Sequence, residues 1–138
     1  MIFNESGKPI YNLFISHSWT YPDKYEGLCR LLDNATDFQY KNYSVPKDDP
    51  IHNAPTDTAL KAAIREQIKH ARCVLILAGV YASYSKWIQI EIELAKEMNK
   101  KIIAVEYWGS ERTSAIVKKE ADVVVKWNTN SIVNEIKY

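Results

Sequence analysis

One carboxylate in this sequence falls on a helical face that is otherwise apolar. On a helical wheel of about 100° per residue, Glu91 lies between Met98 and Ala95, inside the arc of hydrophobic side chains. The rest of this arc is formed by Trp87, Ile88, Ile90, Ile92 and Leu94. An ionised carboxylate on apolar surface must find a partner, shift its pKa, or line a cavity that a polar ligand fills. Glu91 is therefore the first candidate for chemistry; the alternative is a structural glutamate that reaches water or pairs with a lysine.

A second polar group follows the first predicted strand. It consists of Ser16, His17, Ser18 and Trp19. Hydroxyls and ring nitrogens in such a loop can contact phosphate or ribose, and Ser83, just past the third predicted strand, is a further candidate for a ribose contact. Local roles are the alternatives, since His17 can cap or pair with a neighbour and Ser83 can be a loop residue without a ligand.

The elements that must position these side chains alternate along the chain. Apolar runs rich in β-branched and aromatic residues predict strands at residues 11–16, 38–45, 74–79, 101–107 and 122–127. Helical spacing and capping residues predict helices that begin at Pro22, at Thr56 or Asp57, and after Ser85, followed by helices at 114–120 and 131–137. In the last of these, Ile132, Val133 and Ile136 are expected to face the core.

This alternation predicts an α/β fold: a single flavodoxin-like domain over residues 1–138, with a five-stranded parallel sheet and helices on both faces. Ligands in such folds bind outside the carboxyl ends of the strands. Glu91, six residues past Ser85, can reach that edge because helical side chains lean toward the helix N-terminus.

Composition excludes several classes of function. A net charge of +1 gives no general electrostatic reason to bind nucleic acid or an anionic membrane. The start of the chain lacks the pattern of a signal peptide, and no apolar run approaches the roughly 18 residues of a membrane span, so we expect a cytoplasmic protein. Cys29 and Cys73 lie in apolar surroundings and are expected to be buried thiols. We expect no metal and no bound cofactor.

This chain lacks the residues that two functions common on this fold require. A phosphoacceptor receiver needs acids after the first strand and an Asp at the end of the third, where this chain reads ISHSWT and ILAGVY. Flavodoxins and dinucleotide-binding enzymes need phosphate loops after the first strand, and with glycine only at positions 7, 27, 79 and 109 there is no GxGxxG or Walker loop.

Two motifs resemble those of TIR domains. Residues 11–18, YNLFISHS, closely resemble the first TIR box, with Asn12 where an acid is usual. Residues 85–91, SKWIQIE, resemble the Trp-x-x-x-Glu of NAD-consuming TIR enzymes, in register with the predicted fold. The loop PKDDPI at 46–51 is more similar to the prokaryotic TIR-like family that includes the TIR (B) component of the Thoeris anti-phage defence system than to animal or plant TIR domains. The resemblance covers essentially the whole chain.

This resemblance implies an NAD+ glycohydrolase or ADP-ribose cyclase of a bacterial antiviral defence system. Such enzymes cleave the bond between nicotinamide and ribose, and the Thoeris members make a cyclic ADP-ribose-type signal that activates a separate effector protein. Glu91 would be the catalytic carboxylate, because such a group stabilises an oxocarbenium-like transition state. Nicotinamide leaves without needing a proton, so a single carboxylate suffices. NAD+ would be a substrate and not a cofactor.

The resemblance also implies roles around Glu91. Trp87, one turn earlier, would stack on nicotinamide or line the pocket. The alternative is that Trp87 is part of the hydrophobic core. Asn53 belongs to the loop after the second strand, which in TIR proteins gates the pocket and mediates self-association. The alternative for this loop, including Asp48, Asp49 and His52, is a solvated turn-rich segment.

Three hypotheses for the function of this chain remain open from the sequence. Besides the enzyme, the chain is compatible with a non-catalytic TIR interaction module that acts by self-assembly, and with a sensor that binds an NAD-derived nucleotide.

The second predicted helix carries a basic stripe, defined as Lys61, Arg65, Lys69 and Arg72. A solvated face explains this basic stripe, and a protomer contact or phosphate attraction is the alternative.

Overall fold

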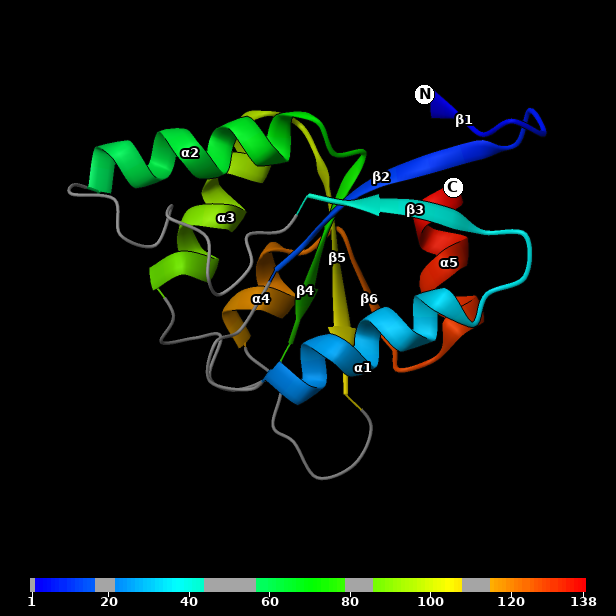
Figure 1. Ribbon diagram of the computed structural model, residues 1–138. Coiled ribbons are helices and arrows are strands. Elements are labelled where there is room, and N and C mark those ends of the chain that lie inside the picture. Colours follow the sequence, from blue (N-terminus) through cyan, green and yellow to red (C-terminus); the bar gives the residue numbers. More distant parts are fainter. Residues whose placement is uncertain (1, 17–21, 44–56, 79–85, 108–114) are drawn as a thin grey trace.

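The computed structural model describes residues 2–16, 22–43, 57–78, 86–107 and 115–138. The strands are β1 (Ile2–Phe3), β2 (Pro9–Ile15), β3 (Gln39–Asn42), β4 (Cys73–Leu77), β5 (Lys101–Glu106) and β6 (Val123–Lys126). The helices are α1 (Pro22–Asp33), α2 (Asp57–Lys69), α3 (Lys86–Glu97), α4 (Ala115–Glu120) and α5 (Thr129–Lys137), as drawn in Figure 1.

Strands β2 to β6 form one parallel sheet in the spatial order β3-β2-β4-β5-β6. The five-stranded parallel sheet predicted from the sequence is thereby confirmed. Its order is that of flavodoxin-like folds, in which the chain starts in an inner strand, moves to one edge, and then crosses back to build the other side. The point where this direction changes lies between β2 and β4.

Strand β1 was not predicted. It pairs antiparallel with the first residues of β2, with Ile2 opposite Ile10. A tight turn joins them: Gly7 has a positive φ of 79°, and the Asn4 side chain accepts hydrogen bonds from the backbone N–H groups of Ser6 and Lys8. Two residues are too short for any alternation of polar and apolar side chains to show, so the sequence pattern is silent on β1.

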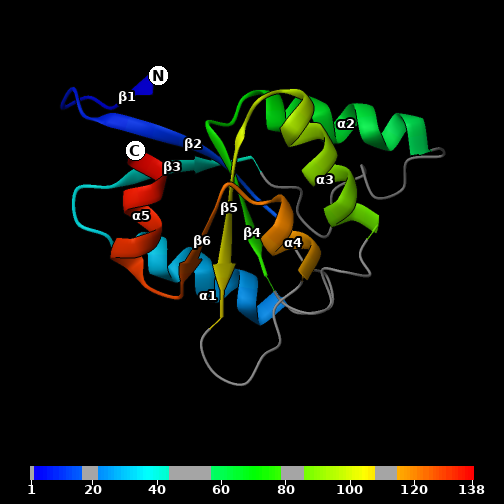
Figure 2. The same cartoon turned by 180° about the vertical axis from the view of Figure 1, so that it is seen from behind.

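Helices cover both faces of the sheet, and each face has its own core. In β4, Val74 and Ile76 pack with α2, α3 and α4, whereas Leu75 and Leu77 pack with α1 and α5. Figures 1 and 2 show these two sets of helices on opposite sides of the sheet. All five residues of β4 are buried, as its nearly continuous apolar sequence predicts.

Most helix boundaries agree with the sequence prediction. Helix α2 begins at Asp57 and α3 at Lys86, while Ser85, the predicted cap of α3, lies outside the described residues. Helix α5 is the exception, because it begins at Thr129 instead of residue 131. The cap is Asn128, whose side chain accepts a hydrogen bond from Ser131 N at 3.0 Å. The residues predicted to face the core in α5, namely Ile132, Val133 and Ile136, are buried.

The basic stripe of α2 is used within the molecule. Arg65 pairs with Glu97 of α3 at 2.7 Å, and Lys61 lies 3.6 Å from Glu93 of the same helix. Arg72 donates to the carbonyl oxygens of Ile136 and Lys137 at the end of α5. These contacts attach α2 and its following turn to α3 and α5, so the stripe is not simply a solvated face.

Both cysteines are free thiols, with Cys73 buried and Cys29 half-buried. The sequence predicts buried thiols at both positions, which is confirmed for Cys73 and only partly for Cys29. Among the residues that the structure describes, no group of three or more His, Cys, Asp or Glu side chains is arranged to hold a metal ion. No described helix has the length and apolar character that crossing a membrane requires.

Candidate functional site

Ser16 follows the last residue of β2 at the carboxyl edge of the sheet. Its backbone N–H donates to Leu75 O of β4 at 2.8 Å, which continues the ladder between β2 and β4. Ser16 therefore lies where the strand order changes direction, the place at which flavodoxin-like folds bind ligands. Because side chains alternate along a strand, Ser16 projects to the same face as Phe14, which packs with α2, α3 and α4.

Glu91 lies in the middle of α3, on the side that faces the sheet. Only 7% of its surface is exposed, and its neighbours Ile92, Leu94 and Ala95 are buried as well. Glu93 and Glu97 are exposed and pair with cations of α2. For the side chains of α3 that the structure describes, from Ile88 onward, the helical wheel drawn from the sequence is confirmed, including the placement of Glu91 in the apolar arc.

The Ser16 hydroxyl donates a hydrogen bond to the Glu91 carboxylate. The distance between Oγ and Oε2 is 2.6 Å, and the two residues are 75 positions apart in the chain. They are also the two buried polar side chains among the described residues. No described lysine or arginine pairs with Glu91, so the structural alternative of an ion pair does not hold for that part of the chain.

Burial controls the protonation of Glu91. Removal from water raises the pKa of its carboxyl group from 4.5 to about 8, and the hydrogen bond from Ser16 opposes this rise. The resting carboxyl group is therefore mostly protonated at neutral pH. A positive charge placed beside it would favour the ionised form, because opposite charges attract strongly where water is excluded.

The side chains of the other predicted site residues lie outside the part of the chain that the structure describes. Trp87 belongs to the first turn of α3, one turn before Glu91, but its side chain lies outside what the structure describes. Outside the described residues altogether are His17, Ser18, Trp19, Asn53 and Ser83. Of the eight predicted residues, the structure brings together Ser16 and Glu91.

The pairing of Ser16 with Glu91 is the feature that sequence reasoning missed. Both residues were assigned to the carboxyl edge, Ser16 as a contact for phosphate or ribose and Glu91 as the catalytic group. Their direct contact depends on how closely α3 approaches the end of β2. The sequence indicates that both residues lie at the same edge of the sheet. Spacing along the chain does not give the distance between two elements, so the contact itself is not predicted.

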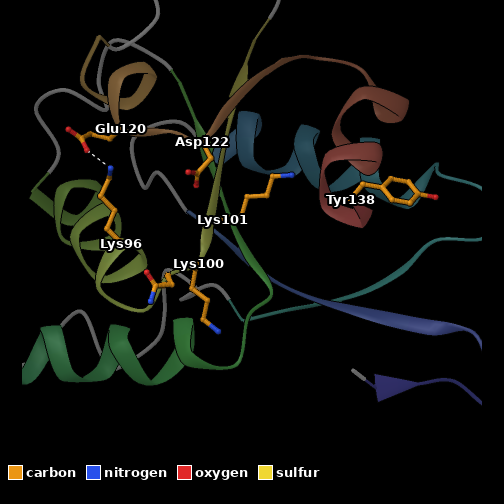
Figure 3. Close-up of a pocket in the computed structure, with 7 residues that line it drawn as sticks. Lys96, Lys100, Lys101, Glu120, Asp122 and Tyr138 are labelled. Carbon is orange, nitrogen blue, oxygen red and sulfur yellow. Dashed lines mark ion pairs between the residues drawn. The ribbon is translucent and has the colours of Figure 1, made fainter.

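A wide polar hollow of about 670 Å³ lies at the opposite edge of the sheet, where β5 begins (Figure 3). Its cations already have partners: Lys96 pairs with Glu120 at 2.7 Å, and Lys101 bonds to Glu135 at 2.9 Å. Lys100 donates to the carbonyl oxygen of Lys69 at the end of α2. These side chains stabilise the C-terminal ends of helices, and we do not assign a ligand to this hollow.

Comparison with known proteins identifies the family. The model of the TIR-like domain of Thoeris protein ThsB matches residues 14–112, which include both Ser16 and Glu91. The chain belongs to this ThsB TIR-like family. The resemblance drawn from the two motifs is thereby confirmed. No curated protein sequence matches the chain.

The fold of this ThsB TIR-like chain is similar to that of a solved N-glycosidase. The structure of the Clostridium botulinum CMP N-glycosidase BcmB matches with a TM-score of 0.51 and 16% sequence identity, over 91% of this chain and 98% of that one. At this level of identity the likeness is one of fold, and it agrees with the flavodoxin-like order of the sheet.

Proposed function

We propose that this ThsB TIR-like protein is an NAD+ glycohydrolase or ADP-ribose cyclase in which Glu91 is the catalytic carboxylate. The observation that carries the proposal is the placement of Glu91. It is a buried acid at the ligand-binding edge of the fold, held by a hydroxyl and not by a described cation.

The chemistry requires one ionised carboxylate. When the bond between ribose C1′ and the nicotinamide nitrogen breaks, its electron pair goes to the ring, and nicotinamide leaves as a neutral molecule. The ribose acquires oxocarbenium character, and the negative charge of Glu91 stabilises it. Positively charged nicotinamide in the bound substrate would also favour the ionised form of Glu91.

The second half of the reaction decides the product. Addition of water at C1′ gives ADP-ribose and releases a proton. Attack by a nucleophilic atom of the same ADP-ribose gives instead a cyclic product, which would act as a signal for a separate effector protein. The proposed substrate-binding residues are Trp87, His17, Ser18, Trp19, Ser83 and Asn53. Ser16 was also expected from the sequence to contact the substrate, but its hydroxyl donates to Glu91. Self-association through the loop after the second strand would complete the arrangement, since closure excludes water.

A second candidate is an N-glycosidase for a nucleotide with a neutral base. One observation favours it: the raised pKa of Glu91 leaves the carboxyl group mostly protonated at neutral pH, and a neutral base needs a proton in order to leave. The similar fold of the CMP N-glycosidase supports testing CMP first. The two candidates predict opposite pH dependence, because one uses the ionised and the other the protonated form of Glu91.

The test is nicotinamide release from NAD+ by Glu91→Gln and by a matched control. Chromatography of the purified protein, and mass spectrometry of lysates from phage-infected cells, would measure free nicotinamide and cyclic product. We expect Glu91→Gln to keep its fold and lose turnover by at least roughly 100-fold, the scale on which charge stabilisation contributes. Glu93→Gln, an exposed acid two residues away, is expected to behave as wild type. Retained turnover in Glu91→Gln would remove the assignment.

A further inference from the structure

The hydrogen bond between Ser16 and Glu91 has no part in the reaction as proposed so far. A serine hydroxyl has one proton, and Ser16 places it on Glu91 Oε2 at 2.6 Å. Phosphate oxygens accept hydrogen bonds but do not donate them, so this hydroxyl cannot donate to a phosphate while it holds Glu91. The geometry therefore conflicts with the phosphate contact predicted for Ser16 from the sequence.

The backbone of Ser16 is fixed by the sheet. Its N–H donates to Leu75 O at 2.8 Å, and the preceding residue, Ile15, is paired with Leu75 in the parallel ladder. Ser16 is 3% exposed, so its side chain has little room to turn away. The hydroxyl is thus held by the central strands of the molecule and not by a surface loop, which makes it a rigid support for a group on α3.

We propose that Ser16 is a positioning residue for Glu91, whose hydroxyl fixes one carboxylate oxygen at the sheet edge and stabilises the ionised form used in catalysis. This inference rests on the proposed function of Glu91. It assigns to Ser16 an action on the catalytic group and not on the substrate.

The electrostatics of the pair agree with this role. Burial is the larger influence on the pKa of Glu91 and raises it, whereas the hydrogen bond from Ser16 lowers it. Hydrogen bonds to a charged acceptor are stronger than those to a neutral one, so the Ser16 hydroxyl favours the carboxylate over the carboxylic acid. Without the hydroxyl, burial would act unopposed and less of the protein would hold an ionised Glu91 at a given pH.

The experiment compares Ser16→Ala, which removes the hydroxyl, with Ser16→Thr, which keeps it. A matched control is Thr129→Val, which removes another hydroxyl donor, one that bonds to Leu31 O at 2.8 Å on the α1 and α5 side of the sheet. The ionisation of Glu91 is followed by carbon-13 NMR of the protein with labelled glutamate. Its resonance is assigned by its absence from Glu91→Gln.

Ser16→Ala is expected to raise the titration midpoint of Glu91, whereas Thr129→Val leaves it unchanged and Ser16→Thr restores most of the wild-type value. With NAD+ as substrate, we expect Ser16→Ala to lower kcat by roughly 10- to 100-fold, the range of one hydrogen bond to a charged group, with little change in KM. The acidic limb of its pH profile is expected to shift upward.

Two results would overturn the inference. One is an unchanged titration midpoint in Ser16→Ala; the other is a rise in KM with unchanged kcat, which would make Ser16 a substrate contact. Failure of the proposed function is separately visible, because wild-type protein would then release no nicotinamide. The NMR titration needs no turnover and still decides whether Ser16 stabilises the charged form of Glu91.

Discussion

At the scale of single residues, the decisive feature is a carboxyl group whose protonation depends on burial. Glu91 is 7% exposed, and its one hydrogen-bond partner in the described part of the chain is a neutral hydroxyl. A partner with a full positive charge would hold the pKa low, whereas Ser16 only moderates the rise. Glu91 therefore remains able to change its charge near neutral pH.

The pH dependence of NAD+ cleavage follows from this pKa. The proposed reaction uses the carboxylate, so kcat/KM for NAD+ is expected to increase with pH and to level off above about 8. Initial rates of nicotinamide release between pH 5.5 and 9.5 measure it, a range of roughly four units around the pKa. CMP cleavage by the same group would instead become faster as the pH falls. A flat NAD+ profile would show that Glu91 ionisation does not limit the reaction.

The free energy of unfolding should also depend on the ionisation of Glu91, but it should decrease as the pH rises, whereas NAD+ cleavage should increase. The folded protein holds the Glu91 proton up to about pH 8, while the unfolded chain releases it near 4.5. The contribution of the Glu91 proton to the stability of the folded state is thus fully present below about pH 4.5 and is lost as the pH rises through about 8. Glu91→Gln stays neutral, so urea denaturation above pH 8 should find it more stable than wild type by roughly 1–3 kcal/mol. Near pH 4.5 the two proteins should be alike, and Glu93→Gln should show no such gain.

At the scale of elements, caps and side-chain contacts between helices set where each helix begins and how it is held. Helix α5 starts two residues earlier than its apolar pattern indicates, because Asn128 caps it. Helices α2 and α3 share a hydrophobic core, and exposed ion pairs such as Arg65 with Glu97 also join them. Exposed pairs of this kind contribute little stability, so burial of the apolar face of α3 is what fixes Glu91 against the sheet.

The cap of α5 gives a prediction at this scale. Asn128→Ala removes the acceptor of the Ser131 N–H and is expected to lower the free energy of unfolding by about 1 kcal/mol. Thermal or urea denaturation measures the change. Asn130→Ala, at an exposed position within the first turn of α5, is the control and should have a smaller effect. Equal losses in both variants would contradict the assignment of Asn128 as the cap.

At the scale of the whole molecule, the candidate site and the contacts that hold the helix C-terminal ends lie at opposite edges of the parallel sheet. Helix C-terminal ends and the lysines and arginine that bind their carbonyl oxygens gather at the amino edge, as with Lys100 on Lys69 O and Arg72 on Ile136 O. Ser16 and Glu91 lie at the carboxyl edge. Because parallel strands all point the same way, the fold itself assigns opposite roles to its two edges.

The inner strands of the sheet, such as β5 between β4 and β6, should carry much of the stability. Ile103 of β5 is fully buried on the α1 and α5 side, and Ile103→Ala is expected to cost about 2–5 kcal/mol. Ile116 of α4, at 40% exposed, is the matched control, and Ile116→Ala should cost less than about 1 kcal/mol. Urea denaturation of both variants measures the difference, and similar costs would contradict the core assignment.

The sequence by itself determined the order of elements, the parallel sheet, the family and the apolar face that holds Glu91. The elements and the apolar face follow from local periodicity, because the continuous apolar run of β4 and the helical spacing of α3 are visible in each segment alone. The family follows instead from the resemblance of two short motifs to those of TIR domains. Short elements such as β1 were lost because two residues hold no period.

Only the tertiary structure decided that Ser16 and Glu91 touch. Their hydrogen bond joins residues 75 positions apart, and its length depends on how α3 packs over the end of β2, which no local pattern records. The raised pKa of Glu91 has the same origin, because desolvation is set by all the atoms packed around the carboxyl group and not by its neighbours in the chain.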